Sequence, residues 1–489
     1  MGQAFVVVNL PDPALIESFT RRMPASFVAS PPHATLTAVY WLLGEGVSID
    51  TDESLRAWRE ALGPNVVHHV TTKGQDDHYA YPHAALLQFC LGQLSPDMFP
   101  LPRLAAPAAV APVKSERLLP KAPRGSEHLD ECRRNLSPPA AERAAIAKYG
   151  EETWQCYKEA AARVRGELEQ AEQAYSPREG VDDFAITMLG TASAVPSKYR
   201  NVSGILLHWP TRYGMRYILL DAGEGTLGQL IRRFGQEETD KILAKLTLCH
   251  VSHLHYDHQA GLYKLLKYRA ELGRREVDVE PMAIFSDQRL HISIREEQRL
   301  LTDAAVMNTQ DIFLKMPGAP PPEILAALDL RELKFVNVEH RCACFGIVLQ
   351  SKHFDLKVVY SGDTMPSDKL IEAGQGATVL IHEATIEDDK PELARAKGHS
   401  TFGQAIDVAA RMKARNVLLT HFSARYPKLP PVAFESRSPK VAVAFDYMTI
   451  RTRDFDKFHK LVEPMELLFG AAGDTRDDES AVLSDLPTP

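Results

Sequence analysis

The sequence lacks the features that mark several protein classes. No apolar run approaches the roughly 18 residues that a membrane-spanning helix needs, and the N-terminus shows no charged and then apolar signal pattern. Six cysteines stand at irregular spacing, which is not typical of a disulfide scaffold and indicates a reducing compartment. We find no internal repeat. We therefore expect a soluble intracellular protein that does not engage a membrane.

An excess of positive charge is also missing. The chain has 64 acidic and 56 basic side chains and a formal net charge of -8, which excludes a general nucleic-acid coat protein. Any binding of nucleic acid must therefore be local. A chain of 489 residues with 45% hydrophobic content can bury a large core and is expected to hold more than one domain.

Hydrophobic patterns divide the chain into five parts. Residues 1–102 alternate between strand-like and helix-like patterns, with strands expected near 3–10 and 65–74, a second apolar run at 35–44 and a helix near 53–63. The Pro/Ala-rich segment 103–140 is predicted to be a linker, and strong helix formers predict one long helical segment over 141–178. We place the chemistry-bearing domain at 183–470 and a disordered acidic tail at 471–489.

The densest cluster of potential metal ligands is HVSHLHYDHQAGL, residues 250–262. A buried-strand pattern precedes it and a helical pattern follows, so the cluster occupies a strand-to-helix turn. On an extended chain His253 and His255 point to the same side, while Asp257 and His258 come where the chain turns and can face elsewhere. One turn could thus serve two metals.

Further ligands must come from downstream, because a catalytic zinc usually takes three protein ligands. His340, Asp363 and His421 each follow a β-like apolar run, and strand ends at one edge of a sheet meet in space. Imidazole and carboxylate ligands suit zinc, with manganese or iron as alternatives. We interpret Cys342 and Cys344 as alternation on a buried strand rather than as ligands.

The order HxHxDH followed by a separate His, Asp and His resembles the metallo-β-lactamase superfamily. The resemblance implies an α/β fold, the four-layer αβ/βα sandwich, here preceded by a partial, degenerate, metal-free lactamase-like domain. It also implies one metal held by His253, His255 and His340, a second held by Asp257, His258 and His421, and Asp363 bridging the two.

Six motifs narrow the resemblance to the catalytic half of long-form tRNase Z, and they span about residues 184 to 470. They are LGTASAVPSKYRNVSGILL (189–207), LLDAGEGTLGQL (219–230), SGDTMPS (361–367), HEATIED (382–388), GHSTFGQA (398–405) and LTHFSARY (419–426). The resemblance implies a zinc-dependent endoribonuclease with two zinc ions that removes the 3′ trailer of precursor tRNA after the discriminator base. Long-form relatives occupy the nucleus and mitochondria, and the first residues of this sequence favour the nucleus or cytoplasm.

The resemblance also assigns roles to single residues. Asp257 is a metal ligand and proton acceptor, His399 is the general acid, and Glu383 orients His399. A carboxylate behind an imidazole fixes its tautomer and favours its protonated form.

Substrate contacts are expected at the PxKxRN motif formed by Pro196, Lys198, Arg200 and Asn201, and at Arg425. Lys and Arg on a loop can meet phosphates, and Asn can bind a base or ribose edge. The expected partner is precursor tRNA, with no DNA and no membrane; the choice between monomer and homodimer stays open.

Two alternatives remain. A small-substrate hydrolase of the glyoxalase II type would use the same ligands, but it gives no reason for PSKYRN or for HEAT with GHST. A truncated, non-catalytic RNA-binding protein is the other alternative. Against it, every expected metal ligand is present, and so are His399 and Glu383.

Overall fold

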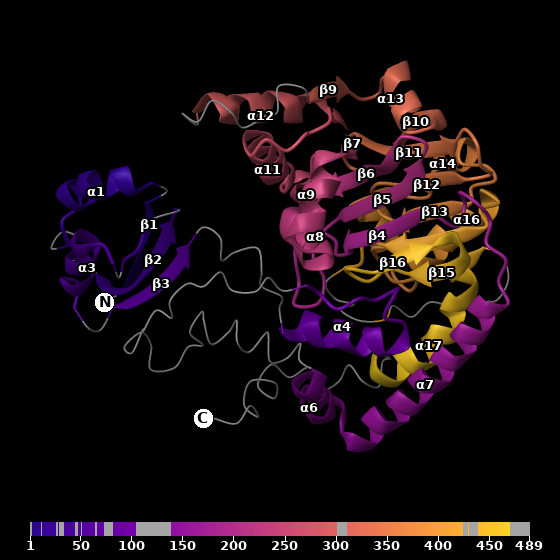
Figure 1. Ribbon diagram of the computed structural model, residues 1–489, viewed down its shortest axis with the longest axis horizontal. Coiled ribbons are helices and arrows are strands. Elements are labelled where there is room, and N and C mark those ends of the chain that lie inside the picture. Colours follow the sequence, from indigo (N-terminus) through magenta and orange to yellow (C-terminus); the bar gives the residue numbers. More distant parts are fainter. Residues whose placement is uncertain are drawn as a thin grey trace. The chain divides into compact units, whose positions relative to one another are not determined.

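The computed structural model describes residues 2–10, 12–25, 28, 34–44, 47–49, 51–63, 66–72, 82–103, 138–300, 311–423, 429 and 439–469 (Figure 1). They fall into two compact units, a smaller one within residues 1–79 and 104–133 and a larger one within 80–103 and 134–489. Most of the predicted linker and all of the predicted tail lie outside the described residues. Within the described part, no helix has both the length and the apolar character to cross a membrane.

The smaller unit is a parallel sheet of three strands in the order β1-β2-β3, with helices on one face. Trp41 on β2 packs edge-on against Trp58 with ring centroids 5.3 Å apart, and its indole N–H donates to Nδ1 of the buried His68 at 3.0 Å. This bond explains His68 as a core residue. Three of the elements were expected from the sequence, namely β1 (Gly2–Leu10), α3 (Glu53–Glu60) and β3 (Val67–Thr72), and β2 (Ala34–Leu43) forms on the apolar run. Two short helices, η1 (Pro13–Leu15) and α1 (Ile16–Arg22), were not predicted.

The larger unit is built on two mixed sheets. The first has the order β16-β4-β5-β6-β7-β8-β9 and the second the order β10-β11-β12-β13-β14-β15. The strands are β4 (Ala185–Gly190), β5 (Gly204–Thr211), β6 (Gly214–Ala222), β7 (Leu246–His250), β8 (Ala283–Ser286), β9 (Ile312–Lys315), β10 (Leu330–Val338), β11 (Cys344–Ser351), β12 (Lys357–Tyr360), β13 (Val379–Glu383), β14 (Asn416–Thr420), β15 (Lys440–Val443) and β16 (Thr449–Arg451).

Helices cover the sheets because the strands are apolar on both faces. On β6, Ile218 and Leu220 enter the core between the sheets, whereas Tyr217 and Leu219 pack under helices on the other side. This is the layered α/β sandwich expected from the sequence. The helices are α8 (Thr226–Phe234), α9 (Gln236–Ala244), α10 (Tyr256–Gln259), α11 (Leu262–Arg274), α12 (Gln288–Leu300), α13 (Pro322–Ala327), α14 (Asp368–Ala373), α15 (Pro391–Lys397), α16 (Phe402–Arg411), η2 (Thr452–Asp454) and α17 (Phe455–Phe469).

The helical segment before the sheets differs from the prediction. Two helices replace the single one, α6 (Pro138–Tyr149) and α7 (Glu151–Gln173), because Gly150 between them has φ of +87°, which a right-handed helix does not allow. α6 also begins inside the segment predicted as a linker. α4 (Pro82–Leu94), within the predicted 1–102 segment, belongs to the larger unit: Phe89 stacks on Trp154 of α7 at 6.1 Å.

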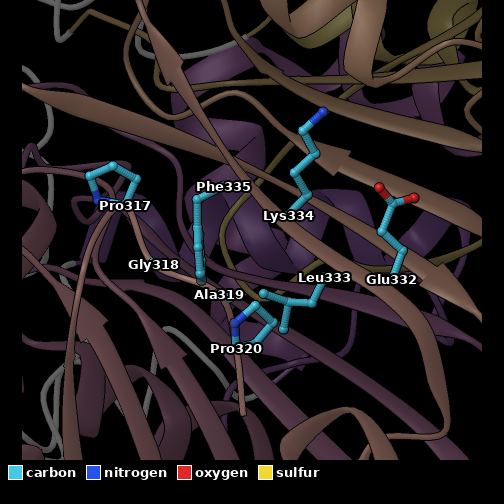
Figure 2. A pocket seen from close by; sticks show the side chains of 8 residues that line it. All are labelled: Pro317, Gly318, Ala319, Pro320, Glu332, Leu333, Lys334 and Phe335. Atoms are coloured by element: carbon cyan, nitrogen blue, oxygen red, sulfur yellow. The ribbon is translucent and has the colours of Figure 1, made fainter. Parts of the chain in front are cut away.

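A pocket lies between the loop after β9 and strand β10 (Figure 2). Its lining is Pro317, Gly318, Ala319, Pro320, Glu332, Leu333, Lys334 and Phe335. It contains none of the predicted metal ligands, so the chemistry must be sought elsewhere.

Candidate metal centre

One edge of the sandwich gathers the predicted ligands. β12, β13 and β14 run parallel, so their carboxyl ends lie at the same edge, where Asp363, Glu383 and His421 follow or end them. The turn from β7 into α10 supplies the HxHxDH residues, and the β10–β11 loop supplies His340. The expectation that these ligands converge therefore agrees with the structure.

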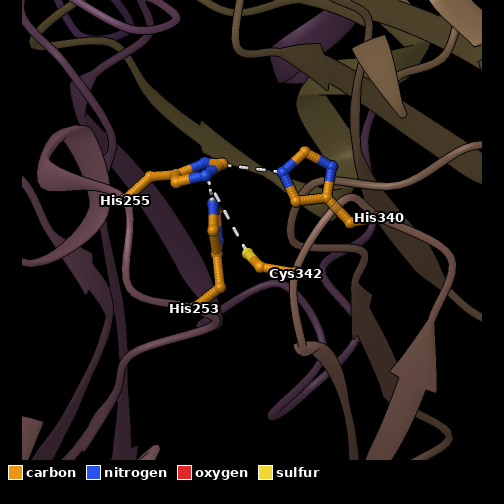
Figure 3. Close-up of side chains that lie close together, drawn as sticks. All are labelled: His253, His255, His340 and Cys342. Atoms are coloured by element: carbon orange, nitrogen blue, oxygen red, sulfur yellow. Dashed lines mark hydrogen bonds between the residues drawn. The ribbon is translucent and has the colours of Figure 1, made fainter. Parts of the chain in front are cut away.

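The first group consists of His253, His255 and His340 (Figure 3). Nδ1 of His255 lies 2.9 Å from Nε2 of His253 and 3.4 Å from Nε2 of His340. Figure 3 shows the three rings pointing toward one another, with the sulfur of Cys342 beside them. Three nitrogens at this spacing suit one metal ion.

The second group consists of Asp257, His258 and His421, all buried. Nε2 of His258 lies 3.2 Å from Nε2 of His421, and Oδ2 of Asp257 lies 3.4 Å and 3.3 Å from these two nitrogens. The backbone N–H of Ala194 donates to the same Asp257 oxygen at 2.7 Å, which holds the carboxylate in place.

Asp363 faces both groups. Its Oδ1 lies 3.4 Å from Nε2 of both His258 and His421, and its Oδ2 lies 3.6 Å from Nε2 of His253 and 4.0 Å from that of His340. Oδ1 is buried and has no hydrogen-bond donor. A buried carboxylate oxygen normally has a partner, so this one indicates a position for a cation.

The tautomers support the same conclusion. Nδ1 of His258 lies 2.8 Å from the Asp221 carboxylate, and the N–H there leaves a lone pair on Nε2. Thr385 donates its hydroxyl to Glu383 at 2.6 Å, so it accepts from Nδ1 of His421 at 2.8 Å, which also leaves a lone pair on Nε2. Two lone pairs therefore converge beside two carboxylate oxygens, an arrangement that requires a proton or a metal cation between them.

Two histidines of the first group, His253 and His340, are oriented in the same way, with Nδ1 donating a hydrogen bond and Nε2 facing the group. Ser252 donates to Asp221 at 2.9 Å and accepts from Nδ1 of His253 at 3.0 Å, while Nδ1 of His340 donates to the Gly398 carbonyl at 2.8 Å. Burial holds the pKa of His253 well below its usual range, so this ring is neutral at pH 7. His253 thus turns a neutral Nε2 toward the group, which is the form that binds a metal, and His255 faces it through Nδ1.

An acid pair stands beside the two groups. Nδ1 of His399 donates to Oε1 of Glu383 at 2.8 Å and lies 3.9 Å from Asp363. Burial lowers the pKa of His399, but the Glu383 carboxylate outweighs that effect and raises it to about 9. His399 lies just before Thr401, the N-cap residue of α16, and not inside the helix. Glu383 is buried, which excludes an exposed surface acid.

Comparison with known proteins matches this geometry. Residues 216–422 match the family model described as a beta-lactamase superfamily domain. Over these residues the chain is similar to the metallo-β-lactamase superfamily. It is 39% identical over 303 residues to Ribonuclease Z, mitochondrial, of Drosophila melanogaster, covering 60% of this chain and 38% of that protein. It is 32% identical over 495 residues to Zinc phosphodiesterase ELAC protein 2 of Rattus norvegicus, covering 96% and 57%.

A solved structure supports the superfamily fold. The crystal structure of a long form RNase Z from yeast superposes with a TM-score of 0.66 at 20% identity, covering 94% of this chain and 71% of that one. The chain spans 38% to 57% of the length of the two curated relatives.

The residues of the loop predicted to contact substrate differ in their exposure to solvent. Pro196 is exposed, Lys198 is half-buried, and the Asn201 side chain donates to the Glu224 carbonyl at 2.8 Å. Arg200, by contrast, is only 3% exposed and donates to Oγ1 of Thr191 and to the Ala444 carbonyl, each at 2.7 Å. Its guanidinium does not face solvent, which corrects the expectation that it meets a phosphate. Arg425 lies outside the described residues.

The two cysteines near His340 also differ from each other. Cys344 begins β11 and is buried, in agreement with the strand interpretation. Cys342 lies in the loop before the strand and is half-buried, because the strand starts two residues later than the pattern suggested. Its Sγ is 3.9 Å from Nε2 of His255.

Asp221 lies behind the candidate site and was not singled out from the sequence. Its carboxylate accepts from His258 at 2.8 Å, Tyr360 at 2.6 Å and the Ser252 backbone at 2.7 Å, so it fixes the orientation of His258 and of the turn that carries it. It lies in the motif LLDAGEG, and its φ of +58° marks the sharp bend there. The motif was visible in the sequence, but the role of its aspartate was not.

Proposed function

We propose that this chain is a zinc-dependent endoribonuclease that removes the 3′ trailer of precursor tRNA. The supporting observation is Asp363, which faces a three-histidine group through one oxygen and an Asp-His-His group through the other, with His399 alongside. The names of the two relatives, Ribonuclease Z and Zinc phosphodiesterase, agree with this activity.

The two groups would hold two zinc ions. His253, His255 and His340 would ligate one, Asp257, His258 and His421 would ligate the other, and Asp363 would bridge them. Such a pair supplies an activated water and neutralises charge on the phosphodiester when it is bound.

The chain's own residues then handle protons and position. Asp257, held by the Ala194 amide, accepts the proton of the attacking water. His399 donates its proton to the departing 3′ oxygen as the bond between phosphorus and that oxygen breaks, and Glu383 keeps His399 protonated at neutral pH. The tRNA is left with a 3′ hydroxyl and the trailer with a 5′ phosphate.

Local contacts would hold the RNA, since the net charge is -8. Lys198 is the cation of the PxKxRN loop that is partly open to solvent, with Pro196 and Asn201 beside it. We place the activity in the nucleus or cytoplasm; the mitochondrial name of one relative keeps that organelle as an alternative. The test for compartment is the location of the tagged full-length protein.

A leaving-group comparison tests the proposed chemistry. His399→Ala should slow cleavage of precursor tRNA by roughly 10²- to 10⁴-fold, but it should spare a nitrophenyl phosphodiester, whose leaving group needs no proton. His459→Ala, an exposed histidine on α17, is the matched control and should change neither rate. Equal loss on both substrates would contradict the acid role, and turnover of a thioester without any phosphodiester cleavage would favour an acyl hydrolase.

A further inference from the structure

The loop that carries His340 also carries a sulfur. Val338 on β10 pairs with Cys344 on β11, so residues 339–343 form the connecting loop. The Met365 amide donates to the Glu339 carbonyl at 2.8 Å, which ties down the start of the loop. The Phe345 amide donates to the Ser252 carbonyl at 3.0 Å, beside the HxHxDH turn. Cys342 is therefore held at the first histidine group.

The spacing suits coordination by all four side chains. One ligand atom from each of His253, His255, His340 and Cys342 lies within 4.8 Å of the others. Nδ1 of His255 lies 2.9 Å from Nε2 of His253 and 3.4 Å from Nε2 of His340, whereas the Cys342 sulfur lies 3.9 Å from the other nitrogen of that ring, Nε2 (Figure 3). A tetrahedral ion with nitrogen at about 2.0–2.1 Å and sulfur at about 2.3 Å sets its ligand atoms about 3.3–3.6 Å apart, so small side-chain shifts are enough.

We propose that Cys342 closes the first group into a four-ligand site, three imidazoles and one thiolate, that takes a thiophilic cation such as Cd²⁺. A fourth protein ligand fills the position that a catalytic site keeps open for water or substrate, and a thiolate favours soft metal ions. On binding, the Cys342 S–H bond breaks, a sulfur–metal bond forms, and the proton leaves to solvent. The consequence, inhibition by soft metals, rests on the proposed nuclease function.

Cys344 provides a matched control. It is also close to the cluster, with Sγ 3.7 Å from Nδ1 of His253, but that nitrogen faces Ser252 and is on the opposite side of the ring from the group. Cys156 on α7 is exposed and reports on non-specific thiol binding. The three cysteines thus separate a thiol in the site, a thiol behind it and a thiol on a distant element.

The direct test is a Cd²⁺ titration of the full chain, followed by the sulfur-to-cadmium charge-transfer absorption in the ultraviolet. The band should appear in the wild type, in Cys344→Ser and in Cys156→Ser, and it should be lost in Cys342→Ser. Losing the thiolate should weaken Cd²⁺ binding by at least the roughly 10- to 100-fold that loss of an outer-shell partner costs. A full band in Cys342→Ser, or its loss only in Cys344→Ser, would overturn the assignment.

Alkylation of the wild-type chain gives a second reading that needs no variant. Cd²⁺ should protect Cys342 from iodoacetamide, as mapped by peptide mass spectrometry, and leave Cys156 reactive. Equal labelling of Cys342 with and without Cd²⁺ would contradict the proposal. Neither readout involves RNA, so the closed site and the nuclease function can fail separately.

Discussion

Replacing Arg200 distinguishes a role in the fold from a role in substrate binding. Its guanidinium carbon lies 4.9 Å from the ring centroids of both Phe422 and Phe445. Thr191 accepts from Arg200 and donates to the buried Asp446 at 2.7 Å, so the guanidinium and the carboxylate share one buried network. Arg200→Met keeps an unbranched apolar side chain and removes the guanidinium with its charge.

The expected loss follows from these contacts. Two hydrogen bonds from a charged donor contribute about 1.5–3 kcal/mol each, and a desolvated cation over aromatic rings contributes about 2 kcal/mol. These effects overlap, and the substitution also leaves the buried Asp446 carboxylate without the Arg200 cation, so we estimate a loss of about 3–5 kcal/mol for Arg200→Met, the cost of leaving a buried charge uncompensated. The described part of the larger unit, which contains Arg200, has roughly 300 residues, and each contributes about 2.1 cal/mol/K of unfolding entropy, so Tm should fall by about 5–8 °C.

Scanning calorimetry with a double-mutant cycle tests this estimate. Asp446→Asn should make the second loss smaller than additive, because the carboxylate is no longer left buried without compensation. Lys198→Ala, on the same loop, should change stability by less than about 0.5 kcal/mol and instead weaken RNA binding and its salt dependence. Unchanged stability in Arg200→Met together with a raised KM for precursor tRNA would refute the structural role.

Three further predictions concern the metal groups and the acid. Asp363→Ala should lose metal from both groups, so that retention of two zinc equivalents in elemental analysis would disprove the bridge. Activity should fall as pH rises through about 9, because the acid His399 loses its proton there. Glu383→Gln should move this limb of the pH–rate profile to lower pH, and an unmoved limb would mean that Glu383 does not raise the pKa of His399. Gly398→Ala should cost about 1–2 kcal/mol and weaken zinc binding, since φ is +76° and the new Cβ would lie 3.2 Å from Nδ1 of His340; normal zinc affinity by competition with a chelator would contradict this.

Part of the convergence of the ligands was predictable from the sequence. Asp363 and His421 each follow an apolar run, and parallel strand ends meet at one edge, so their approach to each other needs no knowledge of side-chain packing. The HxHxDH turn follows β7 of the other sheet, so its place beside them depends on how the two sheets pack. The break at Gly150 was also readable in principle, because a glycine stands between two helical patterns there.

Burial of a charge was not predictable in the same way. Arg200 stands on a polar loop, and the space that receives it is made by Phe422 and Phe445, more than 200 positions away. The same limit applies to Asp221, whose partners His258 and Tyr360 come from two other elements. Cys342 was misplaced because strand ends are the least certain feature of a hydrophobic pattern.

Mapping product ends tests the central claim most directly. The zinc-loaded full chain is incubated with a 3′-extended precursor tRNA, with His253→Ala as the control, and the 3′ ends of the products are sequenced. The proposed function predicts a single end, directly after the discriminator base with a 3′ hydroxyl, and no cleavage by the variant. Ends scattered along the trailer, or no cleavage despite bound zinc, would contradict it.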